Sequence, residues 1–240
     1  MTIHTMGQSP RRREDARFVT GCGAYLDDLH FDRVAHAVVL RSPHAHASLD
    51  AIDTGAAARA PGVLAILTAA DAEADGLKPL RPYVEANVQT GEPFAFAPQP
   101  LLAKEKVRFA GEPVALVVAE THAQALDAAE LIEVRYAPLP AVTTAEAARA
   151  PGAPVLAAEV PGNVCIDWHT GDAAGAARAF AQAAHVVSLS LDNHRIVMNP
   201  MEPRGGVGMF DPGSGRYTLH VSSQSIHNNR NHVARALGVE

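Results

Sequence analysis

Gln224 is the residue whose type and position most favour a binding role. It follows Ser222 and Ser223 at the end of a segment with alternating apolar side chains, and it precedes a helix predicted to begin near Ile226. Ligands of α/β folds bind at such strand-to-helix junctions because backbone N–H groups converge there. Gln224 could therefore bind a ligand through its uncharged amide, or it could cap the helix, although serine and asparagine are preferred as caps. The polar residues that follow, which could face a cofactor, a partner or solvent, are His227, Asn228, Asn229, Arg230 and His232.

Glu202 is a second candidate, because prolines on both sides restrict its backbone. It lies in the sequence NPMEPR at residues 199–204. A rigidly held carboxylate could orient a cofactor or a substrate. It could equally form a structural ion pair with Arg195 or Arg204, and we favour this structural role.

Motifs for metal binding and nucleophilic catalysis are weak in this sequence. His44 and His46 would lie on one side of a strand, but no third ligand has a useful spacing for zinc, so we expect a turn and packing role instead. Cys22 has no identifiable base beside it, and the glycines of 205–208 match neither a dinucleotide-binding nor a phosphate-binding loop. No Ser-His-Asp arrangement is identifiable. We therefore assign no metal ligand and no catalytic residue.

The composition is that of a globular, mildly acidic protein. The 240 residues are 48% hydrophobic and carry a formal net charge of −6. The apolar content excludes a disordered chain, and the negative charge argues against nucleic-acid binding, which needs a basic surface. No apolar run approaches the length of a membrane span, and the N-terminus lacks the apolar region of a signal peptide. We expect a cytoplasmic protein with no nucleic-acid or membrane partner, in which Cys22 and Cys165 form no disulfide framework.

The first half of the chain alternates predicted strands with short predicted helices. Short apolar runs bounded by polar turns predict the strands, and Thr68 and Thr121 are expected N-caps. This alternation indicates an α/β unit. The expected strands are 34–40, 49–52, 63–67, 106–109, 114–118 and 134–136, and the expected helices are 54–60, 69–74 and 123–132, the last with Leu126, Ala129 and Ile132 on one face.

The second half contains a linker and a second α/β unit, and a long loop lies before them. Residues 75–103 hold five prolines and no helical period, and loops of this length are usually functional or bind a partner. Residues 149–163 hold three prolines and indicate an extended linker. After the linker we expect helices at 173–183 and 226–237, strands at 185–191 and 216–222, and a glycine-rich turn within 204–210.

Several segments, taken in order, resemble one protein family. They are RFVTG at 17–21, AYLDD at 24–28, RSPHAHA at 41–47, PGV at 61–63, VRFAGEPVA at 107–115 and AAELIEV at 128–134. In this order they are similar to the α/β hammerhead domain that opens the molybdenum-binding large subunit of the xanthine dehydrogenase, aldehyde oxidase and CO dehydrogenase family. The sequence MEPR at 201–204 and the stretch from SSQ at 222–224 to RALG at 235–238 resemble the start of the molybdopterin-binding region that follows.

The resemblance implies both a fold and an activity. The fold is α/β (α+β), a hammerhead domain followed by an incomplete molybdopterin-binding domain. The activity is oxidative hydroxylation of an aldehyde or an N-heterocycle, with water as the oxygen source, at a molybdenum ion held by a pterin cofactor. Gln224 matches the family glutamine that hydrogen-bonds to the oxygen ligands of molybdenum, so it is the one cofactor-binding residue that we assign. Iron–sulfur clusters and FAD are expected on a small and a medium partner subunit.

The family's large subunit is several times longer than this chain. Its glycine-rich cofactor loop and its general-base glutamate lie beyond the matched region, so we expect the chain alone to be inactive, with a cofactor site shared with a missing C-terminal portion. It would be part of a split or truncated large subunit; the alternative is a non-catalytic remnant or scaffold that binds sister subunits. The expected parts are an arm at 1–16, the hammerhead domain at 17–142, a linker at 143–165 and a truncated first lobe of the molybdopterin-binding domain at 166–240.

Overall fold

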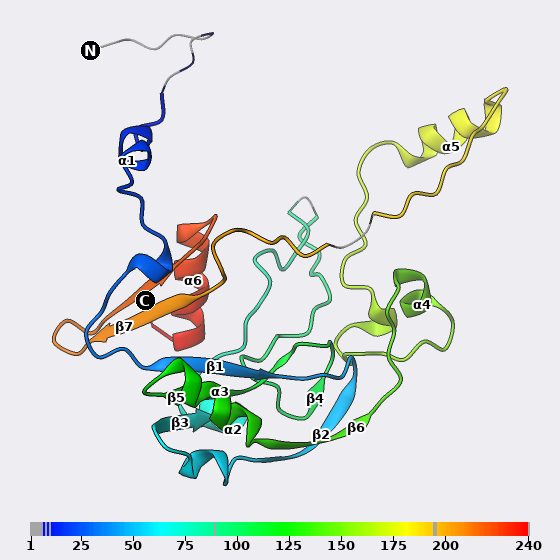
Figure 1. The fold of residues 1–240 in the computed structure, drawn as a ribbon. Helices are drawn as coiled ribbons and strands as arrows, with labels where there is room; N and C mark the ends of the chain where they lie inside the picture. The colour runs from blue at the N-terminus through cyan, green and yellow to red at the C-terminus, as the bar shows by residue number, and fades with distance from the viewer. Residues whose placement is uncertain (1–6, 8, 10, 89, 194–195, 240) are drawn as a thin grey trace. The chain divides into compact units, whose positions relative to one another are not determined.

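The part of the chain that this computed structural model describes, residues 7, 9, 11–88, 90–193 and 196–239, forms short helices and small antiparallel sheets (Figure 1). The mixed helix and sheet architecture that the sequence predicts is therefore confirmed. In chain order the elements are α1 (Asp15–Val19), the 3₁₀ helix η1 (Leu26–Asp28), β1 (His36–Arg41), β2 (Ala47–Asp53), η2 (Ala57–Arg59), β3 (Val63–Leu67), α2 (Ala69–Ala74), β4 (Lys106–Val107), β5 (Pro113–Ala119), α3 (His122–Glu130), β6 (Glu133–Pro138), α4 (Ala145–Arg149), η3 (Pro161–Asn163), α5 (Ala173–Gln182), β7 (Gly206–Asp211), β8 (Arg216–Val221) and α6 (Ile226–Leu237).

These elements belong to two compact units. The sheet unit contains residues 34–189 and, from Ser225 onward, α6. The hairpin unit contains the described residues up to Arg33 together with Ser190–Gln224, and therefore α1, η1 and the β7–β8 hairpin.

Two sheets form the core of the sheet unit. In the first, β5 lies between β1 and β3, and Val117 of β5 is paired with Val38 on one side and Ile66 on the other. In the second, β2 lies between β4 and β6. β-Branched residues such as Val117 are common in central strands, because they pack well on a pleated surface. Ile52 and Val134 pack against the buried residues of both sheets, so one continuous apolar core joins them.

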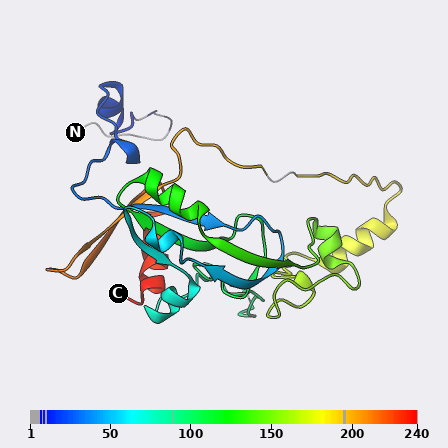
Figure 2. The same cartoon turned by 60° about the horizontal axis from the view of Figure 1, so that its bottom comes forward.

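Helix α3 covers one face of the first sheet (Figure 2). Thr121 caps it, because the Thr121 hydroxyl accepts a hydrogen bond from the Gln124 N–H at 3.2 Å while the Gln124 side chain accepts one from the Thr121 N–H at 3.0 Å. The buried side chains of this face are Ala125, Ala128, Ala129 and Ile132. Leu126, expected on one face with Ala129 and Ile132, is 44% exposed and does not share their burial. At 3.6 residues per turn, Leu126 is rotated by about 100° around the helix from the buried Ala125, which places it at the side of the buried stripe.

Predictions based on local signals agree best with the structure. The bounds of β3, α2 and α6 are those expected from the sequence. The helix expected at 54–60 is reduced to η2. The 149–163 segment is not simply extended, because it contains η3 and is folded by the Asn163 side chain, which bonds to the Leu156 N–H and the Ala148 carbonyl.

Two predictions in the second half of the chain are wrong. Residues 185–191, expected to be a strand, have no regular secondary structure, and Val187 and Leu189 are 90% and 78% exposed. Alternating side chains do not suffice for a strand, since a strand needs a hydrogen-bonded neighbour. The glycine-rich turn expected within 204–210 is instead largely strand β7, which pairs with β8 along its length.

Candidate functional site

Gln224 lies on the short connection between β8 and α6. It directly precedes Ser225, which is the N-cap residue of α6, so the alternative that Gln224 itself caps the helix is wrong. The Gln224 side chain is exposed, and it has no hydrogen-bond partner within the described part of the chain. Its amide donor and acceptor groups are therefore available to a ligand.

The first turn of α6, which belongs to the sheet unit, offers backbone donors of its own. The first N–H groups of a helix have no partner within the helix, and the helix dipole makes them favourable for a negatively charged group. His227 and Arg230 are exposed, whereas Asn228 and Asn229 are half-buried. The Arg230 guanidinium is engaged locally, since it donates to the Asn231 side-chain oxygen at 3.0 Å and 3.2 Å.

Glu202 has a structural role in the hairpin unit. Its Oε1 accepts a hydrogen bond from the Leu26 N–H at 2.9 Å, although 176 positions separate the two residues. Leu26 is the first residue of η1, so the carboxylate satisfies a donor that a helix start leaves free. Among the described residues Glu202 forms no ion pair with Arg204, and Arg195 lies outside them. The structural role that the sequence favours is present, with a backbone partner in place of an arginine.

Gly205, in the glycine-rich segment 205–208, packs against Leu26, the same residue that Glu202 binds. A Cβ on Gly205 would lie 2.8 Å from Leu26 Cδ2, so any larger residue would displace the leucine. Gly206 and Gly208 lie in β7. Gly205 thus allows close packing against η1, and Gly206 and Gly208 form part of a strand.

His44 and His46 lie between β1 and β2, not on a strand. His46 is buried, with Nδ1 2.7 Å from the Pro140 carbonyl oxygen, and the His44 ring lies 4.8 Å from the Tyr136 ring, centroid to centroid. Burial raises the pKa of the Tyr136 phenol. These contacts are the turn and packing role expected from the sequence. Within the described ranges, no group of three or more His, Cys, Asp or Glu side chains is arranged to hold a metal ion.

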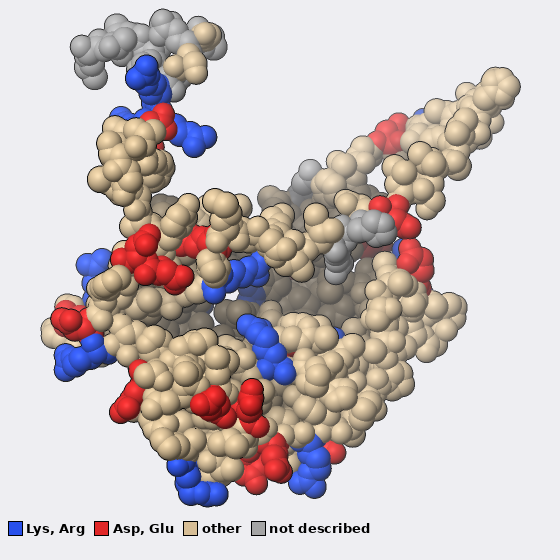
Figure 3. All heavy atoms as spheres, viewed as in Figure 1, with Lys and Arg blue, Asp and Glu red and all other residues tan. Residues whose placement is uncertain are grey.

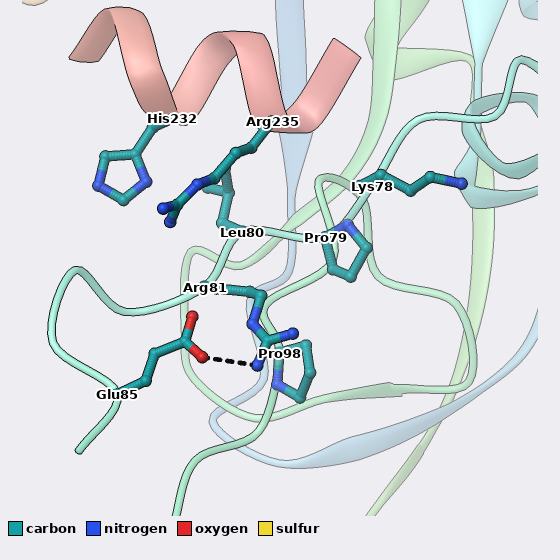
Figure 4. Close-up of a pocket in the computed structure, with 8 residues that line it drawn as sticks. All are labelled: Lys78, Pro79, Leu80, Arg81, Glu85, Pro98, His232 and Arg235. Carbon is teal, nitrogen blue, oxygen red and sulfur yellow. Dashed lines mark hydrogen bonds and ion pairs between the residues drawn. The ribbon is translucent and has the colours of Figure 1, made fainter. Parts of the chain in front are cut away.

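A hollow that the sequence does not predict lies within the sheet unit, between the 75–103 loop and α6. It has a volume of about 480 Å³. The loop is tied to the helix by a hydrogen bond of 2.8 Å from the Lys78 N–H to the Ala236 carbonyl. The prolines of the loop and the spacing of His232 and Arg235 on one helix face are visible in the sequence, but their proximity is not. The residues that line the hollow are Lys78, Pro79, Leu80, Arg81, Glu85, Pro98, His232 and Arg235 (Figure 4).

The surface carries charges of both signs. On the face drawn in Figure 3, acidic and basic side chains are interspersed rather than separated into large patches. Cys22 and Cys165 are both exposed and take part in no disulfide. No helix in the described part of the chain is both long and apolar enough to cross a bilayer.

Comparison with known proteins decides the family. Residues 20–140 match the profile of the aldehyde oxidase and xanthine dehydrogenase a/b hammerhead domain, and residues 156–240 match that of the molybdopterin cofactor-binding domain. The chain belongs to the aldehyde oxidase and xanthine dehydrogenase family. The resemblance carried by the motifs of 17–134 and 201–238 is thereby confirmed.

Individual family members resemble most of this chain. The large subunit of nicotine 6-hydroxylase from Paenarthrobacter nicotinovorans is 39% identical over 95% of the chain, and the large chain of carbon monoxide dehydrogenase from Afipia carboxidovorans is 36% identical over 94%. The structure of reconstituted CO dehydrogenase from Oligotropha carboxidovorans is 34% identical over 98% of the chain, with a TM-score of 0.82. The chain spans only 27%, 28% and 29% of these three proteins, so the similarity is to the N-terminal portion of a family large subunit.

Proposed function

We propose that this chain is part of the molybdenum-binding subunit of a molybdenum hydroxylase that acts on an aldehyde or an N-heterocycle. The observation that carries the proposal is the free, exposed amide of Gln224 at the β8–α6 junction, in a chain matched by a molybdopterin-binding profile. When bound, a molybdenum–pterin cofactor would supply hydroxylation with water as the oxygen source.

The residues present fit such a cofactor. The Gln224 amide is uncharged, so it can both donate to and accept from oxygen ligands without changing the charge of the site. Within the sheet unit, the N-terminal donors of α6 by themselves favour anionic groups such as the phosphate of a pterin cofactor. The role of this chain's own residues is to bind and orient; the general base would come from polypeptide beyond these 240 residues.

The proposal assigns a role to each segment of this chain and to the polypeptides that would bind it. Residues 17–142 would form the hammerhead domain, 143–165 the linker, and 166–240 the first lobe of the molybdopterin-binding domain, with 1–16 as an arm. The remaining polypeptide of the large subunit would complete the cofactor site. Electrons would leave to iron–sulfur clusters and FAD on a small and a medium subunit, as expected for an enzyme of this class.

Native mass spectrometry with molybdenum analysis, on the protein purified with its partners from its own host, tests this assignment. A complex that contains molybdenum and further chains supports a hydroxylase assembled from several polypeptides. A lone chain without molybdenum would overturn the proposal and favour the non-catalytic remnant or scaffold.

Gln224→Ala tests the role of the single assigned residue in that assembled enzyme. We expect turnover to fall by about 10- to 100-fold, the usual effect of losing a hydrogen bond to the ligand shell of a metal, while molybdenum content per chain stays nearly unchanged. The matched control is Gln182→Ala, which removes another exposed glutamine, at the end of α5, and should leave turnover intact. Unchanged turnover in the Gln224→Ala enzyme would show that the assignment of Gln224 is wrong.

A further inference from the structure

The hollow between the 75–103 loop and α6 has a chemistry that the proposed hydroxylase function does not use. Its lining includes the cations Lys78, Arg81 and Arg235 against the single carboxylate of Glu85. This local excess of positive charge occurs in a chain whose formal net charge is −6. The remaining walls are largely apolar, from Pro79, Leu80 and Pro98.

Arg235 is one of two lining cations, with Lys78, whose charged groups have no partner among the described residues. Its side chain and that of His232 extend from α6 toward the loop, whereas the Lys78 ammonium extends away from them (Figure 4). Within the described residues, the Arg235 guanidinium takes part in no hydrogen bond or ion pair. A guanidinium is a planar fork of donors that matches the two oxygens of a carboxylate.

Arg81 already binds a carboxylate in this place. Its guanidinium donates to Glu85 Oε2 at 2.7 Å and lies over the Phe96 ring at 5.1 Å from the centroid. Stacking on an aromatic ring holds the guanidinium in one orientation. The loop itself is braced, because Leu80 and Gln99 exchange two backbone hydrogen bonds of 2.7 and 2.9 Å. The hollow therefore has a braced loop and one positioned guanidinium, that of Arg81.

We propose that this hollow binds a small carboxylate with an apolar body, held by the guanidinium groups of Arg235 and Arg81. A volume of about 480 Å³ is in the range of small-molecule sites. The proline and leucine walls accept the apolar body, and the arginine fork accepts the carboxylate. The site lies entirely within the sheet unit, and it needs neither molybdenum nor a partner subunit, so it stands or falls independently of the proposed function.

Titration of the full chain with benzoate, followed by ligand-observed NMR, tests the proposal. Benzamide, which has nearly the same shape without the charge, and inorganic phosphate are the comparison probes. We expect benzoate to bind with a dissociation constant on the order of 1 mM, because the arginines are exposed to solvent, and we expect both other probes to bind at least about tenfold more weakly. Equal binding of benzamide, or tighter binding of phosphate, would overturn the assignment of a carboxylate.

Variants of α6 locate the site. Arg235→Gln should weaken benzoate binding by at least about tenfold, whereas Arg230→Gln, on the same helix and outside the hollow, should leave it unchanged. Arg235→Lys keeps a positive charge near the helix C-terminus but loses the fork, so it should also weaken binding; undiminished binding would overturn recognition of the carboxylate by the guanidinium fork. The same binding in the Arg235→Gln and unsubstituted proteins would overturn the proposal.

Circular dichroism checks whether Arg235→Gln folds. If it does not fold, Glu85→Gln provides a second test of the site. Glu85 competes with the ligand for Arg81, so removing its charge should tighten benzoate binding severalfold. Unchanged or weaker binding in this variant would contradict a site built on Arg81.

Discussion

Among single residues, Asp71 shows how local hydrogen bonds set the charge behaviour of a side chain. Its carboxylate accepts hydrogen bonds of 2.7 Å from the Thr68 hydroxyl and 2.7 Å from the Thr68 N–H, at the start of α2. The Thr68 hydroxyl and, next, the Thr68 N–H lower the pKa of Asp71 below its ordinary value of 3.8. Because this pKa is depressed, the stabilisation is complete above the ordinary pKa and is lost as pH falls through the folded-state value.

Thr68→Val should therefore raise the pKa of Asp71 toward 3.8, because it removes the larger of the two hydrogen-bond contributions. Fraying of α2 on acidification would then begin at a higher pH. An NMR titration of the side-chain carboxyl carbon measures this pKa directly. Thr144→Val, which removes a similar capping hydroxyl from α4, is the control and should leave Asp71 unaffected. An Asp71 pKa that does not rise in Thr68→Val would contradict the assignment.

Among the secondary-structure elements, the turn between β4 and β5 is organised by a buried glutamate and is hydrogen-bonded to the residue that follows β1. Glu112 is 2% exposed, and its Oε2 accepts a hydrogen bond from the Arg108 N–H. Backbone bonds join the same turn to the residue after β1, since Ser42 N–H donates to the Glu112 carbonyl and Gly111 N–H to the Ser42 carbonyl. Gly111 has φ of +91°, a conformation that other residues adopt only with strain. The turn thus fixes the ends of β1 and β5 together.

Glu112→Ala should destabilise the sheet unit by about 2–3 kcal/mol, because it leaves the half-buried Arg108 N–H without an acceptor and removes a buried side chain. Glu112→Gln retains an oxygen acceptor and should cost less. Urea denaturation of the full chain, followed by circular dichroism, measures both. The exposed Glu120, at the end of the same strand, provides a control, and Glu120→Ala should change stability by less than about 0.5 kcal/mol. A loss in Glu112→Ala no greater than in this control would show that the buried carboxylate is dispensable.

Over the molecule as a whole, apolar burial is unevenly distributed along the chain. Most fully buried side chains lie in or near β2, β5 and α3, whereas α5 contains no buried residue. The described part of 185–201 instead exposes a series of large apolar side chains that have no cover in this structure: Val186, Val187, Leu189, Leu191, Ile196, Val197, Met198 and Met201. Such surfaces favour association with another polypeptide or aggregation.

Limited proteolysis of the chain expressed alone should therefore cut first within 166–201 and leave a resistant fragment that contains β1 to β6. Local unfolding costs the least free energy where few apolar side chains are buried. Mass spectrometry of the fragments identifies the cut sites. In the multi-chain complex that we propose, the same region should become protected. Equal resistance of 166–240 and 17–142 in the isolated chain would contradict this expectation.

Elements whose signals are local can be predicted from the amino-acid sequence. The caps Thr68 and Thr121, the apolar run of β3 and the periodicity of α6 each lie within one element, so the sequence contains the whole of their cause. The ordered motifs likewise indicate the family by themselves, because a series of short sequences in a fixed order is specific even where each one is weak.

Contacts between residues far apart in the chain are set by tertiary packing instead. Packing provides Glu202 with a partner 176 positions away, leaves 185–191 without the neighbour that a strand requires, and joins a proline-rich loop to α6 around Arg81 and Arg235. Neither hydrophobic periodicity nor capping chemistry encodes such contacts, because both describe only neighbours along the sequence.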